Sequence, residues 1–382
     1  MKLLFLCNMK KYSGGELVME RLILNLDSKS YQSIIALPEG EFSARCIVNN
    51  IPVLINNNIP RLNRGEGKIN YLVYLLKLFK GILEISGYVK RNGFDIIIAN
   101  SFGVSLHAGL IGLLTGRKVL WIHHHPVFQK EGINASIARF ASRLSHSVVC
   151  VSNALKRSLI DIRIPEQKIR VIYNGLDLDS FRPLKNDVVN EKITISIVGI
   201  ISKWKGHQYL FNAVHLMSRD IKNRILIDVV GGFIHNSPND LKYKHELDDF
   251  LARYNLQKIV RFVGYKHDMK PYYGTKVDVL VNCSQEPEPL GTTIYEAMSF
   301  EKIVIVTDLG GNVEIVSHLI DGFIVDHRSP LSLAQCLTHV VNNYRTAEIE
   351  GIRKNARKKV TTLFDIKTSV KSYMKVFDEI VS

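Results

Sequence analysis

Uninterrupted apolar runs alternate with helical stretches along the first half of the chain. Runs of Val, Ile and Leu without polar alternation are typical of strands buried on both faces of a parallel sheet. This pattern predicts a doubly wound α/β domain. The predicted strands are Lys2–Cys7, Ser33–Ala36, Val53–Ile55, Ile96–Ala99, Val119–Ile122, Val148–Val151 and Arg170–Ile172.

A second series of apolar runs predicts a second Rossmann-like domain. A turn-rich segment, Asn174–Pro183, and the polar Lys185–Lys192 mark the linker between the two series. A cleft between two such domains is the expected ligand site, because each sheet offers it the carboxyl ends of its strands. The strands of this second series are Ile193–Gly199, Leu226–Val230, Val260–Phe262, Val279–Val281, Ile303–Val306 and Phe323–Val325.

The length of 382 residues also indicates two domains, since it is too long for one ordinary core. We expect the first domain over 1–183, the second over 191–362 and a terminal helix over 363–382. The last stretch of the chain, from Ala347, has helical periodicity. Its apolar positions are Val360, Leu363, Tyr373, Val376, Phe377 and Ile380.

Two carboxylates flank a glycine turn where the strand ending at Asn282 gives way to a predicted helix. Leu290, Gly291, Thr292 and Thr293 follow Glu288, and Glu296 lies one turn further on. Backbone N–H groups and hydroxyls at such a helix start can hold a diphosphate. A carboxylate at Glu296 can accept two hydrogen bonds from a vicinal diol such as a ribose edge. For an isolated pair, a solvated loop charge and a helix-surface residue would be the simpler interpretation.

The seven residues between Glu288 and Glu296, followed by Gly310-Gly311-Asn312 and Glu314, resemble the Glu-x7-Glu signature of retaining GT-B glycosyltransferases of the family 4 type. The resemblance implies two Rossmann-like domains facing across a cleft, with the final helix crossing back to the first. It also implies a nucleoside diphosphate sugar as donor, with Glu288 orienting the sugar and Glu296 binding the ribose. The resemblance further implies front-face attack by the acceptor, and no side chain is an obvious nucleophile on the correct face.

Glycines in two other loops add to the donor site that the resemblance implies. Gly14 and Gly15 follow the first strand and open a helix, where glycine lets backbone approach a phosphate or sugar closely. They resemble the family's Gly-Gly-x-Glu loop, although a plain tight turn explains them equally well. Gly264, after the strand at Phe262, matches the family's base-binding edge. Contacts there are mostly backbone, so they do not identify the base.

Lysines follow the first strand of the second domain. Lys205, before Gly206, is placed to neutralise the diphosphate leaving group as the glycosidic bond breaks. The family usually has arginine directly after the first glycine of this loop, and this chain has Ile200. Lys203 is a candidate to supply the missing charge; the alternative is a solvated loop lysine.

Three consecutive histidines follow a strand of the first domain. Adjacent strand residues point in opposite directions, so His123, His124 and His125 cannot all chelate one ion without strain. In the family that the chain resembles, one histidine here lies near the donor sugar and the reacting centre. The spacing from Trp121 favours His124, with His123 second.

No metal or cofactor is expected beyond the donor substrate. The Asp-x-Asp of the chain, Asp177–Asp179, lies in the linker rather than after a mid-domain strand, so it does not match the metal signature of the other large glycosyltransferase fold. Catalysis is therefore expected to be metal-independent. The five cysteines are scattered without a CxxC spacing, which indicates reduced thiols in the cytoplasm.

The charge of the chain, 50 − 36 = +14, can serve nucleic acid, anionic lipid or an anionic substrate. Between Pro60 and Arg91 seven basic residues interleave with aromatic and aliphatic ones. This segment either adsorbs to an anionic membrane or packs its apolar residues on a sheet, and both can hold at once. Nucleic acid is not an expected partner, because no RNP, KH or zinc motif is present. No apolar run is long enough to span a membrane.

Three functions follow as hypotheses. The first is a retaining glycosyltransferase that transfers a sugar to a lipid-linked or glycan acceptor in surface polysaccharide or glycolipid synthesis, at the inner face of the cytoplasmic membrane. The second is a binding-only partner subunit of a glycan assembly complex, supported by Ile200 alone. The third is a GT-B-like epimerase, which would not need a basic membrane face.

Overall fold

The computed structural model describes residues 1–61, 68–125, 130–183, 191–233 and 238–382. The chain divides into two compact units. Unit 1 contains Met1–Gly175 and Ile366–Ser382, and unit 2 contains Leu176–Asp365. The two units thus meet in the sequence at Gly175 and Asp365, eight and three residues from the expected domain ends at 183 and 362.

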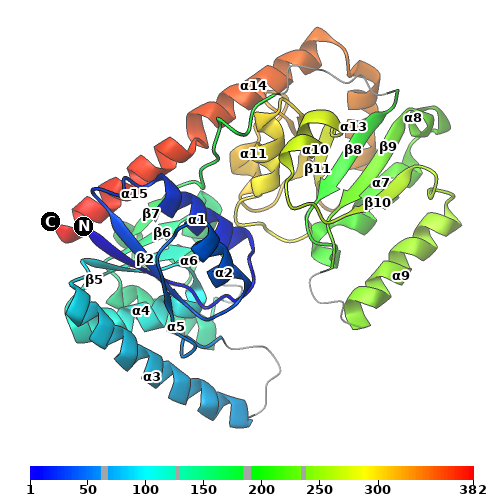
Figure 1. The fold of residues 1–382 in the computed structure, drawn as a ribbon. Helices are drawn as coiled ribbons and strands as arrows, with labels where there is room; N and C mark the ends of the chain where they lie inside the picture. Colours follow the sequence, from blue (N-terminus) through cyan, green and yellow to red (C-terminus); the bar gives the residue numbers. More distant parts are fainter. Residues whose placement is uncertain (62–67, 126–129, 184–190, 234–237) are drawn as a thin grey trace. The chain divides into compact units, whose positions relative to one another are not determined.

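Unit 1 is built from alternating strands and helices (Figure 1). Its elements are β1 (Lys2–Leu6), α1 (Gly14–Asn25), β2 (Gln32–Leu37), α2 (Glu41–Val48), β3 (Val53–Ile55), α3 (Lys68–Asn92), β4 (Ile96–Ala99), α4 (Phe102–Thr115), β5 (Lys118–His123), α5 (Ile133–Leu144), β6 (Ser147–Cys150), α6 (Asn153–Asp161), the 3-10 turn η1 (Glu166–Lys168), β7 (Ile169–Val171) and the chain's last helix α15 (Ile366–Val381).

Unit 2 repeats the alternation (Figure 1). Its elements are β8 (Ile193–Val198), the 3-10 turn η2 (Lys203–Lys205), α7 (His207–Leu216), α8 (Arg219–Asn223), β9 (Ile225–Val230), α9 (Pro238–Arg253), β10 (Val260–Gly264), α10 (Lys270–Thr275), β11 (Val279–Asn282), α11 (Thr292–Ser299), β12 (Ile303–Thr307), α12 (Asn312–Ile315), β13 (Phe323–Val325), α13 (Pro330–Asn343) and α14 (Ala347–Leu363).

Both sheets are parallel, and six of the described strands of the unit 1 sheet follow the same order as the six described in unit 2. In the described residues, unit 1 has the order β3-β2-β1-β4-β5-β6-β7 and unit 2 the order β10-β9-β8-β11-β12-β13. The predicted fold class is confirmed, and each predicted strand coincides with an observed one to within two residues at either end. The order reverses between β1 and β4 and between β8 and β11. Ligands of doubly wound sheets bind at this point, beyond the carboxyl ends of the strands.

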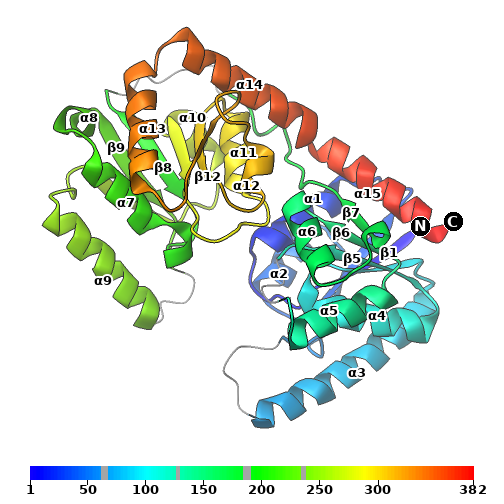
Figure 2. The ribbon, with the colours of Figure 1, turned by 180° about the vertical axis from the view of Figure 1, so that it is seen from behind.

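The core of unit 1 includes the terminal helix. On one sheet face, Leu3, Phe5 and Ile98 pack with residues of α1 and α2 and with the buried face of α15. That face carries Ile366, Val370, Tyr373, Val376, Phe377 and Ile380, whereas Leu363 is 42% exposed at the end of α14. The expected return of the last helix to the first domain is therefore confirmed, and it begins at Ile366. Figure 2 shows α15 beside α1 and β7.

The opposite face of the unit 1 sheet carries α4, which packs against β4 and β5, with α3 and α5 on either side of it. Unit 2 has its own core, formed by β8, β9 and β11 with α7, α9 and α13. No helix among the described residues combines the length and the apolar character needed to cross a bilayer.

Candidate active site

Glu288 lies at the carboxyl edge of the unit 2 sheet, in the loop between β11 and α11. Its side chain is buried, with 6% of the residue exposed. The Lys205 ammonium at the end of η2 lies 2.7 Å from Glu288 Oε1, and Ser284 Oγ donates a hydrogen bond to the same oxygen. The structure therefore brings together two residues that lie 83 positions apart, after the two strands that flank the switch point of the sheet.

A glycine pair supports the backbone of this loop. The N–H of Gly311 donates to the carbonyl of Glu288 over 2.7 Å. Gly310 has φ +62°, and a Cβ there would lie 2.3 Å from Glu288 O. Because only glycine fits so close an approach, Gly310-Gly311 holds Glu288 in place through its main chain.

The start of α11 offers backbone donors on the other side of the loop. Its N-cap is Gly291, which has no side chain to cap the helix. The first N–H groups, on Thr292 and Thr293, are therefore available to an anion, which the helix dipole also favours. A Cβ on Gly291 would lie 2.6 Å from Ile294 Cδ1 and 2.9 Å from Asn312 Oδ1, so this turn is closely packed.

Glu296 lies inside α11 and is buried, with 7% exposed. Tyr273 Oη donates to Glu296 Oε2 over 3.4 Å. Burial, together with the negative charge of Glu296, raises the pKa of Tyr273 well above its usual value. Tyr273 thus remains a protonated donor that fixes the orientation of the carboxylate.

Lys203 is not part of the Lys205–Glu288 pair. Its side chain is 69% exposed, and its ammonium pairs with Glu246 of α9 over 2.8 Å. Within the part of unit 2 that the structure describes, Lys205 is the lysine of η2 that contacts Glu288. Lys203 thus lies at the surface of unit 2, and the role expected of it in supplying the missing charge stays a prediction.

Three glycines lie at the ends of neighbouring strands, and the sequence did not identify them as a group. Gly199, Gly231 and Gly264 follow or end β8, β9 and β10, and all three have positive φ. A Cβ on Gly231 would lie 1.7 Å from Gly199 O, whereas Gly264 has nothing within 4 Å of a Cβ position. The strand ends are consequently bare of side chains, which suits a site where a ligand approaches backbone. The Gly-Gly pair directly after Val230 was the available signal.

A buried amide network also lies at this edge of unit 2. Asn312 Nδ2 donates to Asn282 Oδ1 over 3.3 Å, and Ser284 Oγ lies 3.1 Å from the same oxygen. Thr307 Oγ1 donates to the carbonyl of Ser284 over 2.8 Å. These side chains connect the ends of β11 and β12 with the start of α12, and so fix the loop that carries Glu288.

In unit 1, His124 lies against the glycine loop at the start of α1. Its Nε2 is 3.1 Å from Asn100 Oδ1, and Asn100 Nδ2 donates to the carbonyl of Gly15 over 3.3 Å. A Cβ on Gly15 would lie 4.0 Å from His124 Cδ2. Asn100, after β4, thus links His124 to Gly15, and it was missed because an asparagine after a strand carries no distinctive signal.

His123 is the last residue of β5 and is fully buried. Its ring packs edge-on against Trp121 with centroids 5.1 Å apart. Among the described residues, neither ring nitrogen has a hydrogen-bond partner. The structure therefore places His124, rather than His123, beside Gly15; the catalytic roles expected of both stay predictions.

Buried histidines should make unit 1 sensitive to mild acid. Burial lowers the pKa of His107 to about 4 and those of His123 and His124 to about 3. In the unfolded chain these histidines bind protons near pH 6.5, whereas in the folded chain they do not. Their contribution to the free energy of unfolding is therefore complete above about pH 6.5 and is lost as the pH falls below it. The free energy of unfolding should fall by up to about 1.4 kcal/mol per pH unit for each histidine.

Urea unfolding between about pH 7 and 5 measures this effect, because these histidines titrate there when unfolded. The chain has two tryptophans, Trp121 in unit 1 and Trp204 in unit 2, so Trp204→Phe leaves Trp121 as a reporter of unit 1. His107→Gln, in α4 and away from Gly15, should reduce the slope by up to about a third, since burial also lowers the pKa of His125 and His146 in unit 1. An unchanged slope in that variant would show that His107 is not held neutral.

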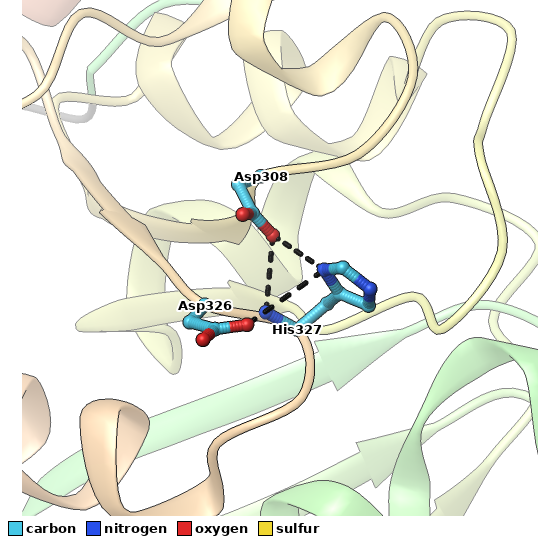
Figure 3. A group of neighbouring side chains, drawn as sticks. All are labelled: Asp308, Asp326 and His327. Carbon is cyan, nitrogen blue, oxygen red and sulfur yellow. Dashed lines mark hydrogen bonds and ion pairs between the residues drawn. The ribbon is translucent and has the colours of Figure 1, made fainter.

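A group of two carboxylates and an imidazole lies at the ends of β12 and β13 (Figure 3). His327 Nδ1 lies 2.7 Å from Asp308 Oδ1, which also accepts the His327 backbone N–H over 3.0 Å. Asp326 Oδ1 accepts the backbone N–H of Arg328 over 2.9 Å. Hydrogen bonds within the loop account for this arrangement, which ties the base of the Gly310 loop to the end of β13.

Two family models together match nearly the whole chain. The model described as "Glycosyl transferases group 1" matches residues 182–359, and "Glycosyltransferase Family 4" matches residues 12–180. The uncharacterized glycosyltransferase MJ1069 of Methanocaldococcus jannaschii is 24% identical over 65% of this chain, and the match spans 62% of that relative, less than two thirds of its length.

Two further proteins are similar over more of their length. The UDP-Gal:alpha-D-GlcNAc-diphosphoundecaprenol alpha-1,3-galactosyltransferase of Escherichia coli is 25% identical over 77% of this chain and 78% of its own. The crystal structure of HepE from Anabaena in complex with UDP has the same fold, with a TM-score of 0.84, 22% identity and coverage of 99% of this chain and 100% of HepE. The chain therefore belongs to the group 1 glycosyl transferases, with the GT-B fold of two Rossmann-like domains.

Proposed function

We propose that the chain is a retaining glycosyltransferase that uses a nucleoside diphosphate sugar, and that unit 2 binds this donor. The observation that carries the proposal is the buried pair of Lys205 and Glu288 at the switch point of the sheet, next to the open start of α11. Similar proteins support it: HepE has been solved with UDP and with UDP-glucose, and the E. coli relative is named for UDP-Gal.

The chemistry expected at this site is electrostatic. Negative charge develops on the diphosphate as the bond to the sugar breaks, and the Lys205 ammonium and the first N–H groups of α11 stabilise it. Because these groups are part of the protein, the proposed mechanism needs no metal ion. Glu288 would orient the sugar and Glu296 the ribose. Holding the donor and the acceptor close together in the reactive orientation supplies the rest of the rate enhancement.

The proposed acceptor is a lipid-linked or glycan hydroxyl in surface polysaccharide or glycolipid synthesis. The diphosphoundecaprenol in the name of the E. coli relative supports the lipid-linked class. An acceptor of that class would place the enzyme at the cytoplasmic face of the membrane. The donor role of Gly264 and the roles of Gly14, Gly15, His123 and His124 in unit 1 belong to the same proposal.

Donor class is tested first by thermal shift with UDP, GDP, ADP and dTDP and their sugar conjugates. A ligand at a hundred times its dissociation constant stabilises by about 2.7 kcal/mol, which is readily measured. Selective stabilisation by one nucleotide identifies the donor class, and hydrolysis or transfer of its sugar then demonstrates catalysis. Binding without either reaction would instead support the binding-only partner subunit, whose case rests on Ile200 and on the surface position of Lys203.

The two lysines of η2 form a matched pair for testing the diphosphate contact. Lys205→Met should weaken binding of the selected nucleoside diphosphate about ten- to a hundredfold, since hydrogen bonds to charged groups contribute about 1.5–3 kcal/mol. Lys203→Met removes the same charge two residues away and should leave affinity within about twofold, because exposed ion pairs contribute little.

Calorimetric titration of both variants gives the comparison, and melting curves check that each is folded. Equal losses in the two variants would indicate a diffuse charge effect. Unchanged affinity in Lys205→Met would remove Lys205 from the donor site.

A further inference from the structure

Helix α3 carries two apolar stripes, and only one of them packs on unit 1. Ile82, Ile85 and Val89 are buried in the domain. A second stripe is open to solvent: Leu72 (62% exposed), Leu75 (55%), Leu76 (62%), Phe79 (65%) and Leu83 (51%). These five residues recur at i, i+3, i+4, i+7 and i+11, so they share one side of the helix. We call them the α3 stripe.

The α3 stripe exposes more contiguous apolar side chains than a solvent-facing helix surface ordinarily does. Single exposed apolar residues are ordinary, but several on one contiguous face mark an interaction site. The sequence left two interpretations of this segment, domain packing and membrane adsorption, and the structure shows that the packing residues and the exposed residues are different ones.

The first half of α3 extends beyond the body of unit 1. Gly81 packs on the loop just after β3, where a Cβ would lie 2.2 Å from Asn58 O, and Asn56 and Asn58 both donate to Glu84 Oε2 over 3.0 Å. Residues 81–84 are therefore level with the carboxyl end of β3. The thirteen residues before them, at 1.5 Å each, continue for about 20 Å past that edge. Figures 1 and 2 both show these turns reaching beyond α4 and α5.

Charge indicates what covers the stripe. Lys77 and Lys80 are exposed beside it, and Lys90 and Arg91 are exposed at the other end of the helix, against Glu84 as the acidic residue of α3. The whole chain carries +14. An apolar stripe flanked by lysines matches the boundary of an anionic bilayer, with apolar side chains among the acyl chains and ammonium groups at the headgroups.

We propose that the α3 stripe, with Lys77 and Lys80, docks unit 1 on an anionic lipid bilayer. The edge past which α3 extends is the edge that carries Gly15, Asn100 and His124, because all three follow the carboxyl ends of strands in the same parallel sheet. If the proposed function holds, docking there presents a lipid-linked acceptor to that edge of unit 1. Bilayer binding itself does not depend on the proposed function.

Vesicle co-sedimentation tests the proposal with the full chain. Wild type should bind vesicles of phosphatidylcholine with phosphatidylglycerol at least tenfold more tightly than vesicles of phosphatidylcholine alone, and salt should weaken that binding. The double variant Leu76→Ser/Phe79→Ser should lose at least tenfold in affinity for the anionic vesicles. Lys77→Gln/Lys80→Gln should lose most of the preference for the anionic lipid.

The matched control is Leu216→Ser/Leu331→Ser, which removes two leucines of unit 2 that are 53% exposed each. It should bind vesicles like wild type. Equal vesicle binding by wild type and the α3 stripe variant would overturn the proposal. So would a wild-type dimer that binds no vesicles and becomes monomeric in that variant, because the stripe would then cover a second copy.

Nucleotide titration of the same variants separates this proposal from the proposed function. Each α3 variant should keep wild-type affinity for the donor nucleotide, since the substitutions lie in unit 1 on exposed positions. Vesicle binding without nucleotide binding would contradict the donor site alone. Nucleotide binding without vesicle binding would contradict the docking surface alone.

Discussion

Glu288→Gln is expected to lower turnover at least about a hundredfold, the loss typical of removing one electrostatic group from a preorganised site. The substitution keeps the size of the side chain and removes its charge. It replaces the charged acceptor proposed to orient the donor sugar with a neutral amide, and it leaves the Lys205 ammonium, which lies 2.7 Å from the carboxylate in the wild type, without its anion. Affinity for the nucleoside diphosphate should stay equal or rise, because an anion is removed from beside the diphosphate.

The chain supplies its own control for this experiment. Glu286 is exposed and lies two residues earlier in the same loop, so Glu286→Gln should keep wild-type turnover. Initial rates with the donor identified by thermal shift, together with nucleotide titration, separate chemistry from binding. Wild-type turnover in Glu288→Gln would exclude Glu288 from the mechanism. A parallel fall in nucleotide affinity and melting temperature would show instead that the loop had unfolded.

Gly231→Ala is expected to cause the largest loss of stability. The alanine Cβ would lie 1.7 Å from Gly199 O, and φ is +145°, which side-chain-bearing residues rarely adopt. Backbone strain and overpacking together cost about 2–6 kcal/mol. For a unit of this size that lowers the melting temperature by about 5–20 °C. Since Gly199 and Gly231 end adjacent strands, nucleotide binding should fall as well.

Gly232, the residue after Gly231, provides the matched control. A Cβ on Gly232 would meet nothing within 4 Å, so Gly232→Ala should melt within about 2 °C of wild type. Scanning calorimetry of both variants makes the comparison. A Gly231→Ala protein as stable as wild type would show that β8 and β9 can separate at their ends without cost.

The fold was predictable because both sheets are buried on both faces. Such strands need no polar alternation, so runs like Ile193–Val198 stand out from the amphipathic helices between them. Glu288 and Lys205 could be chosen as candidates from the sequence, since each follows a strand and lies in a loop with glycine, while the roles expected of them stay predictions. That they form an ion pair required the strand order, which places β8 beside β11.

Other features depended on contacts between distant segments. Lys203 is a candidate for the missing arginine, and the sequence did not show that its partner in the fold is Glu246 of α9, some forty residues later. His124 and Gly15 are joined through Asn100, which no local pattern marks. On α3, periodicity identifies the apolar positions, but the contacts of the helix with α4 and with the loop after β3 determine which of them are buried.

The packing of α15 in unit 1 has a consequence for how the chain is made. Unit 2 is one continuous segment, complete once Asp365 has been synthesised, whereas unit 1 lacks one of its core helices until residues 366–382 have left the ribosome. Tyr373 and Phe377 are fully buried against the first strands. The strands that are synthesised first therefore cannot complete their core until α15 is available. Of the two units, unit 1 is therefore the first to begin translation and the last to be completed.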